Sequence, residues 1–154
     1  MPSNAIPGHG ASVAMELNPS GAQGTFTVIG EMQDIQRPEM SRAETESTTH
    51  QDGIDYWVIA PVIRRGLLSG TVNYVNGDGT LDHLTGLQYA LLNAEERGFQ
   101  ILGPGGSAGV HEWIGSGEVQ LFGPVTYPVR EGLAQAPFAI RLSGPMYIDG
   151  VLFS

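Results

Sequence analysis

The sequence predicts a mainly β protein of the α+β class, built as an antiparallel β-sandwich or partial barrel with one flanking α-helix. Three observations support this fold class. Short runs of β-branched and apolar residues recur along the chain between glycine, proline and asparagine turn signals. Apolar and polar residues alternate with period two inside several of these runs. Only one segment spaces its leucines at three and four residues, as an amphipathic helix does.

Six strands are predicted in order along the chain. They lie within residues 24–38, 55–63, 65–79, 99–123 (two strands around a turn) and 136–148. Pro38 ends the first of these segments and Pro61 interrupts the second. The third ends in "NGDG", a strong turn signal. The glycine-rich "GPGGSAG" between the fourth and fifth strands is expected to be a mobile hairpin tip.

The segment "TLDHLTGLQYALLNAEERG" predicts a helix over about residues 81–96. Asp82 is the expected N-cap, and Gly98 follows the expected end of the helix. One apolar stripe is formed by Leu81, Leu84, Leu87, Leu91 and Leu92.

Each strand is expected to have one buried face and one wet face. The residues predicted to be buried are Phe26, Val28, Leu68, Val72, Tyr74, Trp113, Val119, Leu121, Phe138, Ile140 and Leu142. The wet face is rich in hydroxyls, amides and carboxylates: Thr25, Thr27, Glu31, Gln33, Ser69, Thr71, Asn73, Glu112, Ser116, Glu118, Gln120, Arg141 and Ser143. From the alternation alone, this face is most simply read as an ordinary solvated surface.

Two parts of the chain depart from the strand pattern. Residues 1–24 hold three prolines and four glycines and are predicted to form an extended N-terminal arm, with "ASVAMEL" as its one strand-like piece. Residues 25–154 are predicted to form the single β domain. Within it, residues 41–55 are expected to form a long polar loop, with four acids against Arg42. This loop exceeds the two to five residues usual in a hairpin.

The charge balance argues against a protein that grips nucleic acid through its phosphates. The formal net charge is −9, from 16 acids and 7 bases, and every base is arginine. The sequence has no cysteine, so it offers no disulfide framework or thiolate metal site. Neither a signal peptide nor a membrane-spanning apolar run is present, and folding in the cytoplasm is expected.

No catalytic or metal-binding motif is found. The sequence lacks a GxSxG motif, and its four histidines do not have the spacing of metal ligands. The "GPGGSAG" stretch lacks the Lys-Ser/Thr of a phosphate loop. The carboxylate pairs Glu44/Glu46 and Glu95/Glu96 lie on segments predicted to be exposed, with nothing apolar nearby to raise a pKa. We therefore expect no enzymatic activity, no cofactor and no metal.

The stretch "YVNGDGTLDHLTGLQYALL" resembles the calcium loop and helix of a dockerin repeat. With Gly79 at position six, oxygen ligands would come from Asn76, Asp78 and Asp82. Positions one and twelve, however, are Tyr74 and Thr85, which leaves two principal carboxylates missing. A turn that leads into a helix N-cap is the better interpretation.

The order of these segments resembles the major tail tube protein of long-tailed bacteriophages, the lambda-like tail tube family of siphophages. The matching stretches are "GTFTVIGEMQDIQRPEMSRAETESTTH", "GLLSGTVNYVNGDGTLDHLTGLQYAL", "RGFQIL" and "FAIRLSGPMYIDG". The resemblance covers about residues 24 to 150. The sequence departs from the family in its longer N-terminal arm, and it lacks the C-terminal immunoglobulin-like domain of some members.

The resemblance implies a structural protein of the virion tail, assembled in the host cytoplasm. Family members form rings, usually hexameric, that stack into a hollow tube for DNA and the tape-measure protein. The expected partners are other copies of the chain, the tape-measure protein, tail terminator and distal tail proteins. DNA would pass without specific binding, and no membrane is involved. The residues expected to face the lumen are Thr25, Thr27, Glu31, Gln33, Ser69, Thr71, Asn73, Ser116, Glu118 and Gln120.

The resemblance also implies that the long loop bridges subunits or rings. The loop residues expected to make such contacts are Ser41, Arg42, Glu44, Glu46, Thr48, Thr49, His50, Asp52 and Asp55. Arg42 would pair with an acid on the neighbour, and the arm of residues 1–24 would fold only on polymerisation. The alternatives are a related ring protein, such as a tail terminator, a baseplate protein or the tube of a contractile system, and a carbohydrate- or calcium-dependent binding module.

Overall fold

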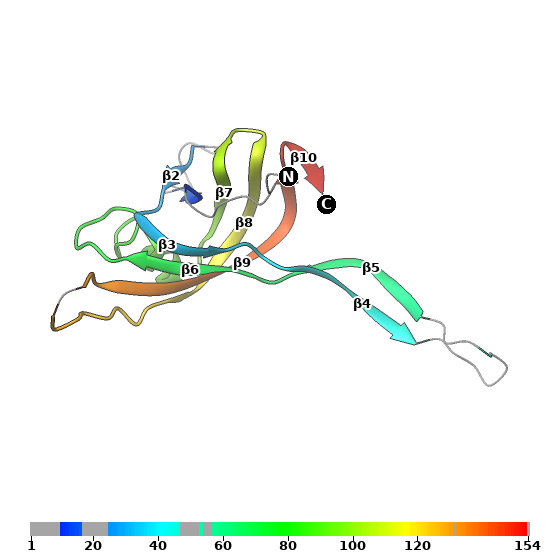
Figure 1. Ribbon diagram of the computed structural model, residues 1–154, viewed down its shortest axis with the longest axis horizontal. Coiled ribbons are helices and arrows are strands. Elements are labelled where there is room, and N and C mark those ends of the chain that lie inside the picture. The colour runs from blue at the N-terminus through cyan, green and yellow to red at the C-terminus, as the bar shows by residue number, and fades with distance from the viewer. Residues whose placement is uncertain (1–9, 17–24, 47–52, 54–56, 131, 154) are drawn as a thin grey trace, which may run out of the picture.

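Figure 1 shows a computed structural model in which a curled β-sheet body carries a long two-stranded ribbon. The structure describes residues 10–16, 25–46, 53, 57–130 and 132–153, with the backbone alone described for residues 45, 46 and 57–62. None of the helices in these residues is long and apolar enough to cross a membrane. The predicted mainly antiparallel β architecture is confirmed.

The described strands form two sheets. Eight strands make one antiparallel sheet in the order β2-β1-β7-β8-β9-β6-β3, with β10 paired to the C-terminal end of β9, while β4 and β5 pair only with each other. The bounds are β1 (Ser12–Met15), β2 (Thr27–Val28), β3 (Glu31–Gln36), β4 (Met40–Glu46), β5 (Trp57–Arg65), β6 (Leu67–Asn73), β7 (Glu96–Ser107), β8 (Val110–Phe122), β9 (Gln135–Ile148) and β10 (Val151–Phe153).

The large sheet curls into a half-barrel, so of the two predicted architectures the partial barrel is formed. The strand order shows why it must curl. β2 and β3 lie at opposite ends of that order, yet only Ile29 and Gly30 separate them in the sequence. The two edges of the sheet are therefore drawn toward each other, and Ile29 is fully buried where they approach.

The core fills the inside of this curl. It is made of apolar side chains from most of the sheet strands and from the helix: Val13, Met15, Ile29, Leu68, Val72, Leu81, Leu87, Ala90, Phe99, Ile101, Val119, Ala136, Phe138, Ile140 and Leu142. Burial of these side chains is the main favourable contribution to the stability of the body.

Several predicted faces are confirmed, but Val28, Leu121, Glu112 and Asn73 are not where the alternation put them. Phe138, Ile140 and Leu142 are buried on β9, as predicted. Val28 is 54% exposed because Ile29, outside the short strand β2, turns inward in its place. Leu121 is 48% exposed, next to a register shift in the pairing of β8 with β9 that reverses the alternation. The Glu112 carboxylate is buried and accepts hydrogen bonds from the Gln100 side chain and the Gly109 N–H.

The helix is shorter than predicted. α1 spans Leu87–Leu92, whereas the sequence predicted about 81–96. The preceding residues form turns, in which the Asp82 carboxylate accepts hydrogen bonds from three backbone N–H groups rather than capping the helix. Gly86 occupies the N-cap position without a side-chain hydrogen bond. Consequently Leu84 and Leu92 are 65% and 73% exposed, and the predicted apolar stripe is broken.

Part of the predicted N-terminal arm belongs to the body of the subunit. β1 pairs with both β2 and β7, and the side chains of Val13 and Met15 are fully buried in the core. Ser12–Met15 is therefore a strand of the sheet and not part of an extended arm, while the expectation that the arm folds on polymerisation stays a prediction. Residues 1–9 and 17–24 lie outside the described residues.

Candidate assembly surfaces

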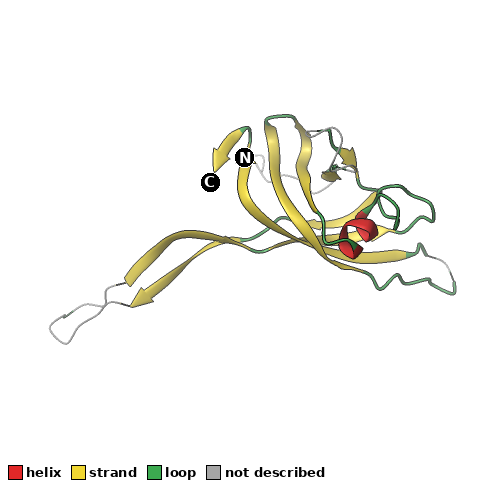
Figure 2. Cartoon of the chain, turned by 180° about the vertical axis from the view of Figure 1, so that it is seen from behind, coloured by secondary structure: helices red, strands yellow, loops and turns green. Residues whose placement is uncertain are grey.

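The ribbon of β4 and β5 is the feature that most distinguishes this chain from a closed β domain. It extends away from the body in Figures 1 and 2. Its register runs from Met40 opposite Arg65, at the body, to Glu46 opposite Trp57, at the outer end. Apart from a few contacts at its root, the ribbon packs on no other element of the described chain.

The ribbon corrects the prediction of a loop over residues 41–55. Residues 41–46 belong to strand β4, so a hairpin arm replaces the first part of the expected loop. The side chains of Ser41, Arg42 and Glu44 are exposed on it. Of the other predicted contact residues, Glu46 is described only through its backbone, and Thr48, Thr49, His50, Asp52 and Asp55 lie outside the described residues.

The second strand of the ribbon is the more apolar one. β5 reads "WVIAPVIRR", and its backbone lies in a two-stranded sheet that no other described element covers. The register between β4 and β5 shifts between Arg42 and Glu44, which places Pro61 opposite the irregular part of the ladder. Because Pro61 cannot donate a ladder hydrogen bond, a bulge in an exposed ribbon is a site that tolerates it. Sequence analysis predicted this proline as an interruption of the strand.

The polar residues predicted on β3 and β6 lie together on the outer face of the sheet. The Gln33 side-chain amide donates to the Asn73 oxygen at 2.9 Å, and the Asn73 amide donates to the Glu31 carboxylate at 3.0 Å. Asn73 is only 8% exposed, so it is covered by these partners rather than wet. Ser69 donates to Gln36 at 3.3 Å, and Thr71 pairs in register with Asp34 on the same face.

The other predicted wet residues lie farther along the sheet. Ser116, Glu118 and Gln120 are on β8, which β9 separates from β6 in the strand order, and Glu118 pairs in register with Arg141 of β9. Thr27 is exposed in β2 and Thr25 is exposed just before it, at the opposite end of the strand order. The predicted set is thus one row on β3 and β6, a second group on β8, and two separate threonines. That these residues face a lumen remains a prediction.

The Arg97 side chain, on β7, links the sheet to the helix and to the turns before it. It is 1% exposed and forms an ion pair with Glu95 at 3.0 Å. It donates to the Thr85 carbonyl at 2.7 Å and to the Glu16 carbonyl at 3.3 Å. The guanidinium carbon also lies 5.4 Å from the centre of the Tyr89 ring. These contacts join three separate parts of the body through one buried cation.

The turn before the helix holds a carboxylate that stays ionised. Hydrogen bonds from the Thr85 backbone N–H, which has the largest effect, and from those of Leu84 and Gly86 lower the pKa of Asp82, against the opposing effect of burial. Asp78 accepts from both the N–H and the hydroxyl of Thr80, at 2.9 and 2.7 Å. Among the described residues, no group of three or more acids and histidines is placed to hold a metal ion.

A pocket of about 390 Å³ opens near the root of the ribbon, between the end of β3 and the hairpin of β7 and β8. Ile101, Trp113 and Ile148 line it as neighbours in one cross-strand row. The guanidinium carbon of Arg37 lies 4.8 Å from the centre of the Trp113 ring, a distance suited to a cation–π contact. Within the described part of the chain, this end of the core is therefore only partly closed.

Sequence analysis missed two features of the ribbon. One is the pairing of the polar strand β4 with the apolar strand β5, and the other is the number of arginines where the ribbon joins the body. The first could have been found from two strand-like segments on either side of a polar stretch, which is the pattern of a hairpin. The second could have been found from Arg64 and Arg65 at the end of an apolar run.

No protein-family model matches the sequence, and no curated protein matches it either. Three solved structures contain chains that share the fold over nearly the whole length. A chain from the tail of an empty GTA particle with C6 symmetry has a TM-score of 0.69 and 16% identity, over 94% of this chain and 98% of that one. A chain from the six-fold symmetrised baseplate of the anti-feeding prophage has a TM-score of 0.63 and 13% identity, over 98% and 100%.

The third is a chain from the sheath/tube terminator of an extracellular contractile injection system in its extended state. Its TM-score is 0.62 and its identity 12%, over 99% of both chains. At such identities the similarity establishes the fold alone. This chain therefore has the fold of components of tails and injection particles.

Proposed function

We propose that the chain is a ring-forming subunit of a phage-type tail tube, whose rings stack into a hollow conduit. The fold supports this, because the similarity to chains from tail and injection particles covers the body and the ribbon together. The observation that carries the proposal is the ribbon of β4 and β5, on which no other element of the described residues packs as a layer. Among tail tubes, the siphophage type is the one that the sequence pattern favours.

The ribbon needs a partner for physical reasons. An isolated two-stranded hairpin is marginally stable at best in water. The apolar sequence of β5 makes this arrangement costly in the free subunit and favourable once a neighbouring copy covers it. On this proposal Ser41, Arg42 and Glu44 contact the neighbour, and the predicted contact residues from Glu46 to Asp55 extend the same surface.

The polar face of the sheet suits the wall of a conduit. Glu118 is exposed on it, beside amides and hydroxyls of β3, β6 and β8. Such a wall repels phosphate and offers few cations to bind it, so DNA would pass with little attractive drag. In a ring, pairing of neighbouring subunits would also cover the sheet edges that are open in the single chain. The six-fold symmetry of two of the similar particles supports a hexamer.

The proposal places the chain in a virion tail that is assembled in the host cytoplasm. Its partners would be further copies of itself, a tape-measure protein inside the tube, and terminator and distal proteins at its ends. It would perform no catalysis and need no cofactor.

A second candidate function is a ring protein at the end of a tube. The specific observation in its favour is that two of the similar structures are a baseplate and a sheath/tube terminator. The two functions differ in what the purified protein builds. A tube subunit stacks into rings of indefinite number, whereas a terminator closes one ring and stops.

Negative-stain electron microscopy of the purified chain, alone and with a tube initiator, tests the proposal. We expect tubes with a constant diameter. Rings that never stack would favour the terminator function, and a persistent monomer under all seeded conditions would count against both.

A deletion of residues 45–52 tests the role of the ribbon. We expect a folded monomer with the wild-type circular dichroism spectrum that no longer polymerises, because the deletion removes contact residues and leaves the body intact. Normal polymerisation of this variant would show that the ribbon is not an assembly element.

A further inference from the structure

Most of the arginines of this acidic chain gather where the ribbon joins the body. The sequence has 7 basic residues, and the following are at this junction: Arg37, Arg42, Arg64, Arg65 and Arg141. We call these residues the basic root. The pairing of the strands brings them together, since Arg64 lies opposite Ser41, and the Arg141 guanidinium donates to the Arg65 carbonyl at 2.9 Å.

Among the described residues, no acid neutralises the basic root. Glu39 and Glu44 lie beside it, but the ion pair of the described residues is the buried one between Arg97 and Glu95. Arg42 and Arg64 are exposed, and neither has a hydrogen bond or ion pair with another described residue. Within the described part of the chain, these two exposed guanidiniums therefore lack a carboxylate partner.

A cluster of acids lies at the other end of the molecule. It consists of Glu31, Asp78 and Asp82, which we call the acidic end. Thr80 connects its parts, because its hydroxyl accepts from the Gly30 N–H at 3.1 Å and donates to the Asp78 carboxylate at 2.7 Å. Three backbone N–H groups donate to the Asp82 carboxylate, which lowers the pKa of Asp82 and stabilises its ionised form.

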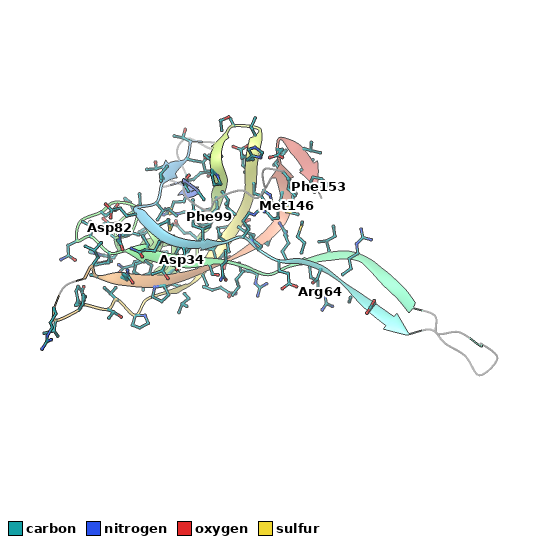
Figure 3. All side chains as sticks on the ribbon, in the orientation of Figure 1. Asp34, Arg64, Asp82, Phe99, Met146 and Phe153 are labelled. Atoms are coloured by element: carbon teal, nitrogen blue, oxygen red, sulfur yellow. The ribbon has the colours of Figure 1, made fainter. Side chains whose placement is uncertain are left out.

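The two charged regions lie apart along the long axis: the acidic end is on the side of the body away from the ribbon, and the basic root is where the ribbon leaves the body (Figure 3). Figure 3 labels Asp82 at one end of the body and Arg64 on the ribbon beyond the other end. Arg130, in the loop between β8 and β9, is a basic residue outside the root that is exposed. Two copies related by a two-fold axis across these ends would bring like charges together, whereas a head-to-tail arrangement would bring opposite charges together.

We propose that the basic root binds the acidic end of a second copy, and that this contact sets the head-to-tail polarity of the stacked rings. The inference rests on the proposed function and adds to it the surface, the partner and the direction of stacking. Each single exposed ion pair contributes little. In a ring the contact repeats at every subunit, and the repeats act together through a high effective concentration.

The contact should be sensitive to salt. The Debye length falls from about 10 Å at 0.1 M to about 3 Å at 1 M ionic strength, so exposed charges lose most of their attraction over this range. Burial of apolar surface does not weaken in this way. Salt dependence therefore separates this contact from an apolar contact made by β5.

Sedimentation velocity of the full chain at about 0.1 M and about 1 M salt tests the inference, because it reports any self-association whether or not tubes form. We compare the wild type with the double variant Arg42→Glu/Arg64→Glu and with Glu31→Lys. The matched control is Arg130→Glu, which has the same change of charge at an exposed arginine outside the root. Circular dichroism of each variant establishes that it is folded.

At low salt we expect the root variant and Glu31→Lys to raise the concentration needed for assembly by about tenfold or more, and the control to leave it unchanged. High salt should reduce the difference between the wild type and the variants. If the wild type assembled equally well at both salt concentrations, and the root variant assembled as well as the wild type, the inference would be overturned and the proposed function would stand. A wild type that stays monomeric at both salts would overturn the two together.

DNA is another polyanion that a basic surface could bind. Adding a DNA oligonucleotide to the same proteins tests whether the basic root binds DNA and not a second copy of the chain. If the root variant assembled normally but lost DNA binding that the wild type showed, the root would be assigned to DNA and the inference would be wrong.

Discussion

Leu68, Val72 and Ile140 of the body are fully buried by residues of their own chain, whereas Met40 and Ile63 of the ribbon are 45% and 42% exposed. Both regions are antiparallel strands joined by backbone hydrogen bonds. The body curls on itself, so one face of its sheet becomes a core. The ribbon has two strands and no second layer, so it cannot form a core from its own residues.

This difference indicates which property each region determines. Changes in the body should alter the free energy of unfolding of the single subunit, because the contacts there are complete. Changes in the ribbon should leave that free energy almost unaltered and act on assembly, where the missing contacts are made. The following predictions test this separation.

The largest effect on the subunit is expected from Arg97→Ala. The change removes the buried guanidinium and leaves the Thr85 carbonyl and the Glu95 carboxylate without their partner. Loss of one member of a buried ion pair costs about 3 kcal/mol or more. Denaturant unfolding measures this cost. The control is Arg130→Ala, an exposed arginine, for which the change should be within about 0.5 kcal/mol. Equal stability of the two variants would contradict the structural role of Arg97.

A smaller loss of stability is expected from Gly70→Ala, where β6 passes beside β3. A Cβ atom at this position would lie 2.1 Å from the Asp34 carbonyl oxygen and 3.1 Å from the Phe138 ring. The strands must separate to admit it, at a cost of about 2 kcal/mol. Gly79→Ala is the matched control, because its nearest contact would be the Thr85 hydroxyl at 3.6 Å. The midpoint of thermal unfolding should fall for Gly70→Ala and not for Gly79→Ala. A similar fall in both variants would show that the close approach of β6 to β3 at Gly70 does not cause the loss of stability.

Alternation in the sequence predicted the body better than it predicted the ribbon. In β6 and β9, which have one face in the core, Leu68 and Ile140 follow the period of two. The sequence of β4 shows no such alternation, because among the described residues neither face of the strand is buried. For this reason the hydroxyl and acidic residues of β4 were predicted to form a loop.

The predicted helix was too long because the spacing of leucines gives no information on the hydrogen bonds that nearby polar side chains make with the backbone. The Asp82 carboxylate holds the N–H groups of Leu84, Thr85 and Gly86 in a turn, which is an alternative to helical hydrogen bonding. At Gly86, a Cβ atom would lie 2.5 Å from the Leu81 nitrogen, so the chain is packed too closely there for any other residue. Of the candidate assembly residues, the row on β3 and β6 was predicted from alternation. In the basic root, only the neighbours Arg64 and Arg65 are visible as a pair in the sequence, because Arg42 and Arg141 come close to them through pairings between distant strands.

The smallest effect on the subunit, and the sharpest test of the comparison, is expected from Ile63→Ser in β5. Ile63 is 42% exposed and pairs with Arg42 in the ribbon, so its substitution should change the free energy of unfolding by about 0.5 kcal/mol or less. Ile140→Ser, at a fully buried position of β9, should by contrast destabilise the subunit strongly. If the ribbon serves assembly, Ile63→Ser should still raise the concentration needed for polymerisation several-fold, as measured by sedimentation. A variant that is much less stable as a monomer would show that the ribbon is part of the folding unit, and the separation of the two regions would fail.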